Sequence, residues 1–174
     1  ITMNLPDLLQ LSGNYWNTCT LHAGVKLDVF TPLTDTPLSA RELAHSLAVD
    51  ERGLEMLLHA LTALELLQKD GEFFRATAFS STYLSRQSDS YMGHIIMHHH
   101  YLVKGWSRLD EAIKTGGPVR KRLSHDAADK ERESFLMGMF NLASLLAPCV
   151  AEKINLDGKR RLLDLAGGPG TYAI

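Results

Sequence analysis

The chain of 174 residues is long enough for one domain of a little over a hundred residues and the start of a second. Its apolar fraction of 45%, charged fraction of 22% and net charge of -2 are those of an ordinary soluble protein, and they exclude a general attraction to nucleic acid or anionic lipid. Cys19 and Cys149 form no Cys-x-x-Cys pair, which favours reduced thiols. Because no apolar run approaches membrane-spanning length and no secretory signal opens the chain, we expect a cytoplasmic protein that binds no membrane.

The first element is a predicted helix over residues 7–30, which begins near Pro6 and ends before Pro32. Gly13 and Asn14 predict a break within it. Aromatic and aliphatic side chains so early in the chain favour a helix that packs against another subunit as well as its own domain, although ordinary core packing explains them equally well. The residues that recur on one face are Trp16, Ala23, Leu27 and Phe30.

Two short helices and a hairpin follow. The capping box at residues 39–42 opens a helix to about residue 47, and Asp50 caps a second helix over 51–66. Asp-Gly at 70–71, between two short extended runs, predicts a β-hairpin. Helix, turn, helix and hairpin in this order predict a winged helix. The apolar stripe of the second helix consists of Leu54, Leu57, Leu58, Leu61 and Leu64.

A winged helix raises the question of DNA binding, which the charge of this segment argues against. Residues 36–75 contain four basic and seven acidic side chains, a net charge of -3. The candidate recognition helix opens with Asp50, Glu51 and Glu55, where a DNA reader would face phosphates. We therefore expect a structural winged helix that binds no nucleic acid.

After another short helix over 77–84, a long helix is predicted over 89–115, ended by Gly-Gly-Pro at 116–118. His94 and His98 lie one turn apart on it, a spacing that suits a metal ion. No third ligand is evident by spacing, which favours histidines packed in an apolar seam or lining a pocket and predicts no metal site. A role in hydrogen-bonding a substrate hydroxyl or in sensing pH stays open. The helix's apolar stripe consists of Tyr91, Ile95, Leu102, Trp106, Leu109 and Ile113.

Residues 120–130 are polar and predict a loop, followed by a helix from about 126 to 147 that Pro148 should end or kink. Its apolar stripe is more typical of a core face than of a cofactor site. The stripe consists of Phe135, Met139, Leu142 and Leu146.

The last stretch, Arg161 to Ala173, is the most informative one. Leu162, Leu163 and Leu165 predict a buried strand, the glycines after them a tight turn, and Thr171 the start of a helix. A strand, a glycine loop and a helix N-terminus form the nucleotide-binding corner of a doubly wound sheet. A parallel strand needs a crossover and a neighbour, so we expect the nucleotide-binding domain to begin here and to continue beyond residue 174.

Two ligands fit this corner, and a plain glycine turn is the third interpretation. Gly168-x-Gly170-x-x-Ala173 fits the dinucleotide fingerprint, which alone is a weak signal. The stretch from Asp164 to Gly170 instead resembles the D-x-G-G-G-x-G motif of S-adenosylmethionine-dependent methyltransferases. Ala166 stands where that motif has its first glycine.

Together these segments resemble the plant-type and bacterial small-molecule O-methyltransferases, the family of acetylserotonin and caffeate methyltransferases. The resemblance runs through nearly the whole chain, and its specificity comes from the order and spacing of the segments. Leu27 to Phe30 resembles the family's l-g-l-f-d segment, and residues 54–67 resemble its l-x-R-l-L-r-x-L-x-x-x-G-l-l stretch. Further similar segments are Ala40 to Ala44, Trp106 to Leu109 with Gly117-Pro118, and Phe135 with Met139.

The resemblance implies a mainly α-helical chain with a winged-helix dimerisation domain over residues 1–117. Residues 118–174 would hold linking helices and the first strand and glycine loop of a Rossmann-like α/β domain. It implies S-adenosylmethionine as cofactor, a homodimer formed through the N-terminal domain and a small hydroxylated acceptor. The implied cofactor-binding residues are Asp164, Ala166, Gly167, Gly168 and Gly170, and the implied acceptor-pocket residues are Val103, Trp106, Phe135 and Met139.

The reaction that the resemblance implies is methyl transfer to a hydroxyl of a small aromatic metabolite by in-line displacement at the sulfonium. The family's histidine base is expected beyond residue 174, so no histidine of this chain is assigned a catalytic role and the chain alone is expected to be inactive. The alternatives are a winged-helix DNA-binding regulator and a nicotinamide-dependent oxidoreductase. The second alternative needs an acidic residue about twenty residues beyond the loop.

Overall fold

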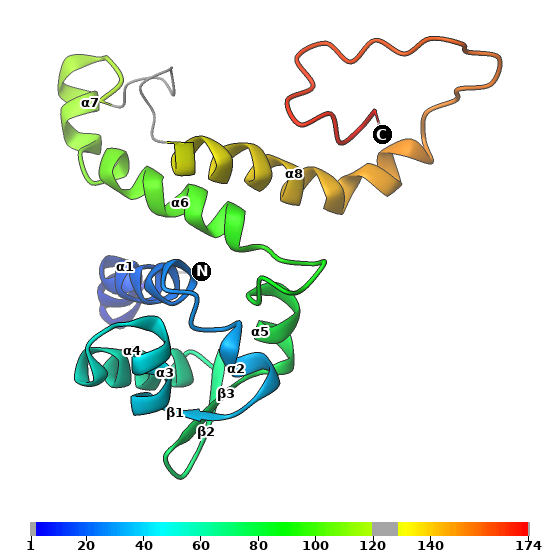
Figure 1. The fold of residues 1–174 in the computed structure, drawn as a ribbon. Helices are drawn as coiled ribbons and strands as arrows, with labels where there is room; N and C mark the ends of the chain where they lie inside the picture. Colours follow the sequence, from blue (N-terminus) through cyan, green and yellow to red (C-terminus); the bar gives the residue numbers. More distant parts are fainter. Residues whose placement is uncertain (1–2, 120–128, 174) are drawn as a thin grey trace. The chain divides into compact units, whose positions relative to one another are not determined.

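The computed structural model describes residues 3–119 and 129–173. In this part of the chain the protein is mostly helical with one small sheet, and it divides into two compact units, residues 1–93 and 94–174 (Figure 1). The elements in chain order are α1 (Leu5–Lys26), α2 (Pro32–Asp35), β1 (Leu38–Ser39), α3 (Ala40–Leu47), α4 (Glu51–Ala63), β2 (Leu67–Asp70), β3 (Phe73–Ala76), α5 (Ala78–Tyr83), α6 (Gly93–Trp106), α7 (Leu109–Thr115) and α8 (Asp129–Ala151).

Two features expected from the sequence stay predictions. The domain division at residue 117 stays a prediction. The loop predicted over 120–130 lies almost entirely outside the described residues.

Helix α1 is continuous, so the break predicted at Gly13 and Asn14 is wrong. The Trp16 ring covers Gly13 so closely that a Cβ on Gly13 would lie 3.0 Å from the ring. Glycine has a lower helix propensity than alanine and therefore destabilises the helix slightly, but it does not interrupt the helix hydrogen bonds. Asn4 caps the helix in a reciprocal capping box with Asp7. Of the predicted face, Phe30 is fully buried, whereas Trp16 is 65% exposed.

Helices α3 and α4 begin where their caps predict. The Ser39 side chain accepts a hydrogen bond from the Glu42 N–H, and the Glu42 carboxylate accepts from the Ser39 N–H at 2.8 Å. The Ser39 hydroxyl also donates to the Glu42 carboxylate at 2.6 Å, and this hydrogen bond, together with the one from the Ser39 N–H, lowers the pKa of Glu42. Asp50 Oδ1 accepts from the Gly53 N–H at 2.7 Å and so caps α4.

The sheet has the order β1-β3-β2, with both neighbours antiparallel to β3, and confirms the predicted hairpin. Its residues alternate as a half-buried sheet requires, because Phe74 and Ala76 are buried and Phe73 and Arg75 are exposed. The core of this unit is formed by the buried side chains of Val25, Val29, Phe30, Leu33, Leu43, Leu54, Leu58, Leu61, Leu67, Phe74 and Leu84.

A polar clip ties the end of α1 to the segment after α5. Asp28 has a left-handed backbone, φ 59°, and its carboxylate accepts from the Thr31 hydroxyl at 2.6 Å and pairs with Arg86 at 3.2 Å. The Arg86 N–H donates to the Thr31 hydroxyl oxygen at 3.0 Å. Burial raises the pKa of Tyr91 nearby, and the charge of Arg86 opposes that rise.

The helix predicted over 89–115 is divided into α6 and α7. The Arg108 N–H bonds to the carbonyl of Gly105 in a tighter i to i+3 pattern, so the helix ends at Trp106 and restarts at Leu109. Gly116 then ends α7 with a left-handed φ of 68°, as the Gly-Gly-Pro signal predicts.

The sequence predicts that α8 ends or kinks at Pro148; the helix continues through this proline to Ala151, so the predicted end is wrong. A proline so close to the C-terminus of a helix removes one hydrogen bond of the last turns only. The expectation that no segment approaches membrane-spanning length is also wrong for α8, which has a mean hydropathy of 1.6 over a membrane-length window that is 17% buried. A single such helix is weak evidence for a membrane, because helices of soluble proteins pass the same test.

The strand predicted at 162–165 does not form: residues 162–164 have no regular secondary structure, and Leu165 lies in a turn. Leu163 and Leu165 are each 84% exposed. A single parallel strand has nothing to pair with unless a neighbouring strand is present, so an apolar run alone does not produce it.

The left-handed residue that follows α4 yields a stability prediction. Glu65 has φ 59°, and it stands where the family pattern quoted above has glycine. We expect Glu65→Gly to raise the free energy of unfolding by about 1 kcal/mol, because glycine relieves the strain at positive φ while losing some entropy. Glu65→Ala is the matched control, since it removes the charge and keeps the Cβ. Urea unfolding measures both, and an equal effect of the two variants would show that the charge, not the backbone, matters.

Candidate functional site

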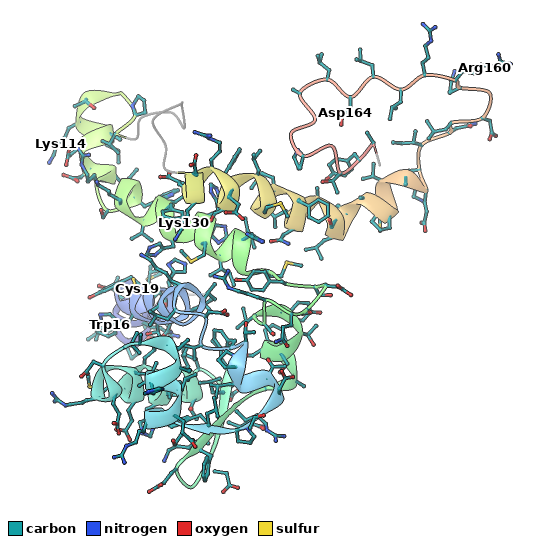
Figure 2. All side chains as sticks on the ribbon, in the orientation of Figure 1. Trp16, Cys19, Lys114, Lys130, Arg160 and Asp164 are labelled. Carbon is teal, nitrogen blue, oxygen red and sulfur yellow. The ribbon has the colours of Figure 1, made fainter. Side chains whose placement is uncertain are left out.

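The glycine loop from Asp164 to Gly170 is the candidate cofactor site, and Figure 2 shows Asp164 on the C-terminal segment. Its backbone is left-handed at three positions, Ala166 with φ 60°, Gly168 with φ 60° and Gly170 with φ 74°. The Gly170 N–H donates to the Gly167 carbonyl at 3.0 Å and closes the turn. The loop therefore has the turn that the motif predicts, although the strand before it is absent.

The residues of this loop fit a ligand that needs close access to the backbone. A Cβ added at Gly168 or Gly170 would meet nothing within 4 Å, so the loop is open there. A Cβ added at Gly167 would overlap the Asp164 carboxylate, which therefore lies against the bare backbone. The hydroxyl oxygen of Thr171 is buried with no hydrogen-bond partner in the described part of the chain. Sequence reasoning did not single out this hydroxyl.

Ala166 is the departure from the motif, and the structure gives it a physical meaning. An L-residue with a Cβ in the left-handed region costs roughly 1 kcal/mol relative to glycine. The first glycine of the family motif thus corresponds to a position with a left-handed backbone. This chain has alanine at that position, and its backbone is strained there.

The second group of predicted residues lies on α6 and α8, which run side by side and antiparallel (Figure 1). A Cβ on Gly138 would lie 3.1 Å from the Ile95 Cα, so the two helices cross closely at this glycine. His98 lies three residues after Ile95 on α6, and Phe135 lies three residues before Gly138 on α8. The centroids of their rings are 5.2 Å apart. His98 is 8% exposed, in agreement with a histidine packed in a seam.

The structure brings only some of the predicted acceptor-pocket residues together. Phe135 and Met139 lie one turn apart on α8 and are half-buried. Val103 and Trp106 lie on the C-terminal half of α6, 39% and 67% exposed. Their roles in a pocket stay predictions.

Sequence reasoning missed the small and polar stripe by which α8 packs on α6. Ser134, Gly138 and Asn141 are the buried residues of α8, at spacings of four and three. This spacing is the signal that was available, because it is the helical period of one face. Among residues 3–119 and 129–173, no three His, Cys, Asp or Glu side chains are placed to share a metal ion.

A hollow of about 810 Å³ lies along the β2–β3 hairpin, lined by residues of both strands with Pro37 and Thr62. None of the predicted site residues lines it. Its charged residues include both signs, Lys69, Asp70 and Arg75, and they define no single ligand chemistry.

Comparison with known proteins identifies the class of the first unit. Residues 9–86 match the O-methyltransferase dimerisation domain. This part of the chain is therefore a dimerisation domain of the O-methyltransferase family, as the sequence resemblance predicts.

Individual relatives support the same family over nearly the whole chain. The chain is 36% identical to 3-hydroxy-5-methyl-1-naphthoate 3-O-methyltransferase of Streptomyces sahachiroi, over 97% of this chain and 51% of that protein. An O-methyltransferase family protein from Burkholderia thailandensis has a similar structure, with a TM-score of 0.83 and 34% identity over 99% of this chain and 52% of the other. Human N-acetylserotonin methyltransferase, solved in complex with SAM, shares the fold with a TM-score of 0.73 and 21% identity, over 89% of this chain and 50% of the other. The chain spans about half the length of the curated relatives that it matches.

The close crossing of α6 and α8 gives a testable prediction. We expect Gly138→Val to lower the free energy of unfolding by roughly 1–3 kcal/mol, because the added atoms must push α8 away from the Ile95 backbone. Leu145→Val, on the same helix at a side chain that is 61% exposed, is the control and should change it by less than about 0.5 kcal/mol. Thermal or urea unfolding followed by circular dichroism measures both, and equal effects would contradict the close contact.

Proposed function

We propose that the chain is the N-terminal part of an S-adenosylmethionine-dependent methyltransferase that methylates a hydroxyl of a small aromatic metabolite. The observation that carries the proposal is the open loop from Asp164 to Gly170, which follows an O-methyltransferase dimerisation domain and has left-handed backbone at three motif positions. The aromatic hydroxyl acceptor named for the Streptomyces sahachiroi relative supports the acceptor class.

Within this proposal the loop binds the amino-acid end of S-adenosylmethionine, the group that supplies the methyl. Asp164 offers a carboxylate for a positively charged group, and Gly167, Gly168 and Gly170 leave the backbone bare for close approach. Ala166 belongs to the same loop and contributes backbone only. The acceptor lies against Phe135 and Met139, with Val103 and Trp106 nearby, and the general base belongs to the chain beyond residue 174.

The dimerisation domain supports a homodimer, and we propose that residues 5–16 of α1 form part of its interface. This segment presents a continuous apolar surface that a solvated helix does not need. Trp16 lies on α1 (Figure 2) and is 65% exposed. The other exposed apolar residues of this surface are Leu5, Leu8, Leu9, Leu11 and Tyr15.

We further propose that α3, α4 and the hairpin form a structural winged helix in a cytoplasmic protein. The element order and the antiparallel hairpin support this proposal. The acidic start of α4, with Asp50 as cap and Glu51 in the first turn, argues against DNA binding, because phosphates would be repelled.

Cofactor binding tests the proposal first. We expect the full-length protein to bind S-adenosylhomocysteine in calorimetric titration, and Gly168→Val to lose most of that affinity because a β-branched residue does not adopt its φ of 60°. Gly158→Val is the matched control, since Gly158 has φ 70° in a turn outside the loop and should suffer similar strain without losing affinity. A full-length protein that binds no S-adenosylhomocysteine would sink the proposed cofactor.

Methyl transfer tests the reaction and the position of the base. With labelled S-adenosylmethionine, we expect the full-length protein to methylate a hydroxynaphthoate and to leave the corresponding methyl ether unchanged. Residues 1–174 alone should transfer no methyl group, because the base is expected beyond them. Transfer by these residues alone would place the base within this chain.

The interface proposal is tested by a charge on α1. We expect Trp16→Glu to shift the full-length protein from dimer to monomer in sedimentation velocity, because a buried carboxylate without a partner opposes association. Met56→Glu on α4, at a side chain that is 58% exposed, is the control and should remain dimeric. Two variants that are equally dimeric would exclude this part of α1 from the interface.

A further inference from the structure

His98 is a buried histidine of α6 whose ring lies against a residue of the proposed acceptor pocket. It is 8% exposed. The centroids of the His98 and Phe135 rings are 5.2 Å apart, and the ring planes are tilted by 57°. Aromatic rings attract one another at centroid distances of about 4.5–7 Å when they are offset or tilted. The two rings therefore form an aromatic pair between α6 and α8.

The backbones beside this pair are held at a fixed distance. A Cβ on Gly138 would lie 3.1 Å from the Ile95 Cα, so α6 and α8 cannot approach more closely there. Phe135 lies three residues before Gly138 and therefore near the same face of α8. A phenylalanine on a helix has two common χ1 rotamers, and a buried ring beside it restricts the change from one to the other. We therefore expect the direction of the Phe135 ring to depend on the side chain at residue 98.

Ordinary packing is the structural alternative, and it makes different predictions. If His98 only filled the seam, leucine could replace it, because leucine fills a similar volume without a buried polar nitrogen. Loss of the histidine would then change the stability of the protein without weakening one ligand more than another. The aromatic pair, in contrast, needs a ring at residue 98, so phenylalanine should replace histidine and leucine should not.

We propose that His98 is a positioning residue for the methyl acceptor, and that it holds the Phe135 ring in the orientation that packs against a flat aromatic acceptor. The inference rests on the proposed function, which places the acceptor against Phe135. His98 acts through Phe135 and takes no part in proton transfer. Its contribution is to orientation, on which the rate depends because the reacting atoms must be aligned.

Acceptor binding to the full-length protein, saturated with S-adenosylhomocysteine, tests the proposal. The probe is 3-hydroxy-5-methyl-1-naphthoate, the compound named for the Streptomyces sahachiroi relative. In calorimetric titration we expect His98→Leu to weaken this probe about 3- to 10-fold, the effect of one lost aromatic pair, and to change the affinity for S-adenosylhomocysteine by less than about twofold. His98→Phe should retain both affinities. His99→Leu, at the exposed next residue of α6, is the matched control and should also retain both.

A double-mutant cycle tests whether His98 acts through Phe135. In a Phe135→Leu background we expect His98→Leu to change the affinity for the naphthoate by less than about twofold, because the ring that His98 positions is already absent. An undiminished effect of His98→Leu in this background would overturn the positioning role.

The remaining outcomes overturn the proposal in distinguishable ways. Equal weakening of the naphthoate and S-adenosylhomocysteine, or equal effects of leucine and phenylalanine at residue 98, would show ordinary packing. Unchanged naphthoate affinity in His98→Leu would show no role. Wild-type protein that fails to bind either ligand would overturn the proposed function together with this inference. Thermal unfolding checks that the variants fold, and His98→Gln repeats the comparison if leucine lowers the unfolding temperature.

Discussion

Left-handed backbone at the chain reversals is the constraint on which both the fold and the candidate site depend. Asp28 follows α1, Ala48 ends α3 and Glu65 follows α4, each with a positive φ that an L-residue adopts only at a cost. The surrounding contacts hold these residues in place, as the clip of Asp28 with Thr31 and Arg86 shows. The helices of the first unit can pack around one core because the chain turns back sharply at these points.

The same constraint defines the glycine loop. Gly168 and Gly170 satisfy it without strain, and Ala166 satisfies it with strain. A loop that must stay bare for a ligand and also turn sharply has two reasons for glycine at the same positions. Alanine meets the first reason nearly as well, because its side chain is small, and it meets the second only partly. Alanine in place of the motif's glycine therefore affects the access of a ligand less than it strains the backbone.

The sequence predicts best those features that local chemistry determines. The capping box of Ser39 with Glu42, the Asp50 cap and the Asp-Gly hairpin depend on atoms a few residues apart, and all three are present. The strand at 162–165 depends on a neighbouring strand, and the apolar pattern alone did not produce it. The division of α6 from α7 at Ser107 and Arg108 results from an i to i+3 backbone hydrogen bond, which the spacing of apolar residues does not predict.

Helix α8 shows why the candidate site was only partly predictable. The apolar stripe predicts the packing face, yet the buried residues are Ser134, Gly138 and Asn141. Of the stripe itself, Phe135 and Met139 are half-buried, and Leu142 and Leu146 are exposed. A helix with small and polar residues inside and apolar residues outside reverses the pattern of a solvated helix. Composition alone therefore makes α8 resemble a membrane span. Apolar surface of this kind needs no lipid to explain it, because a protein surface covers it equally well.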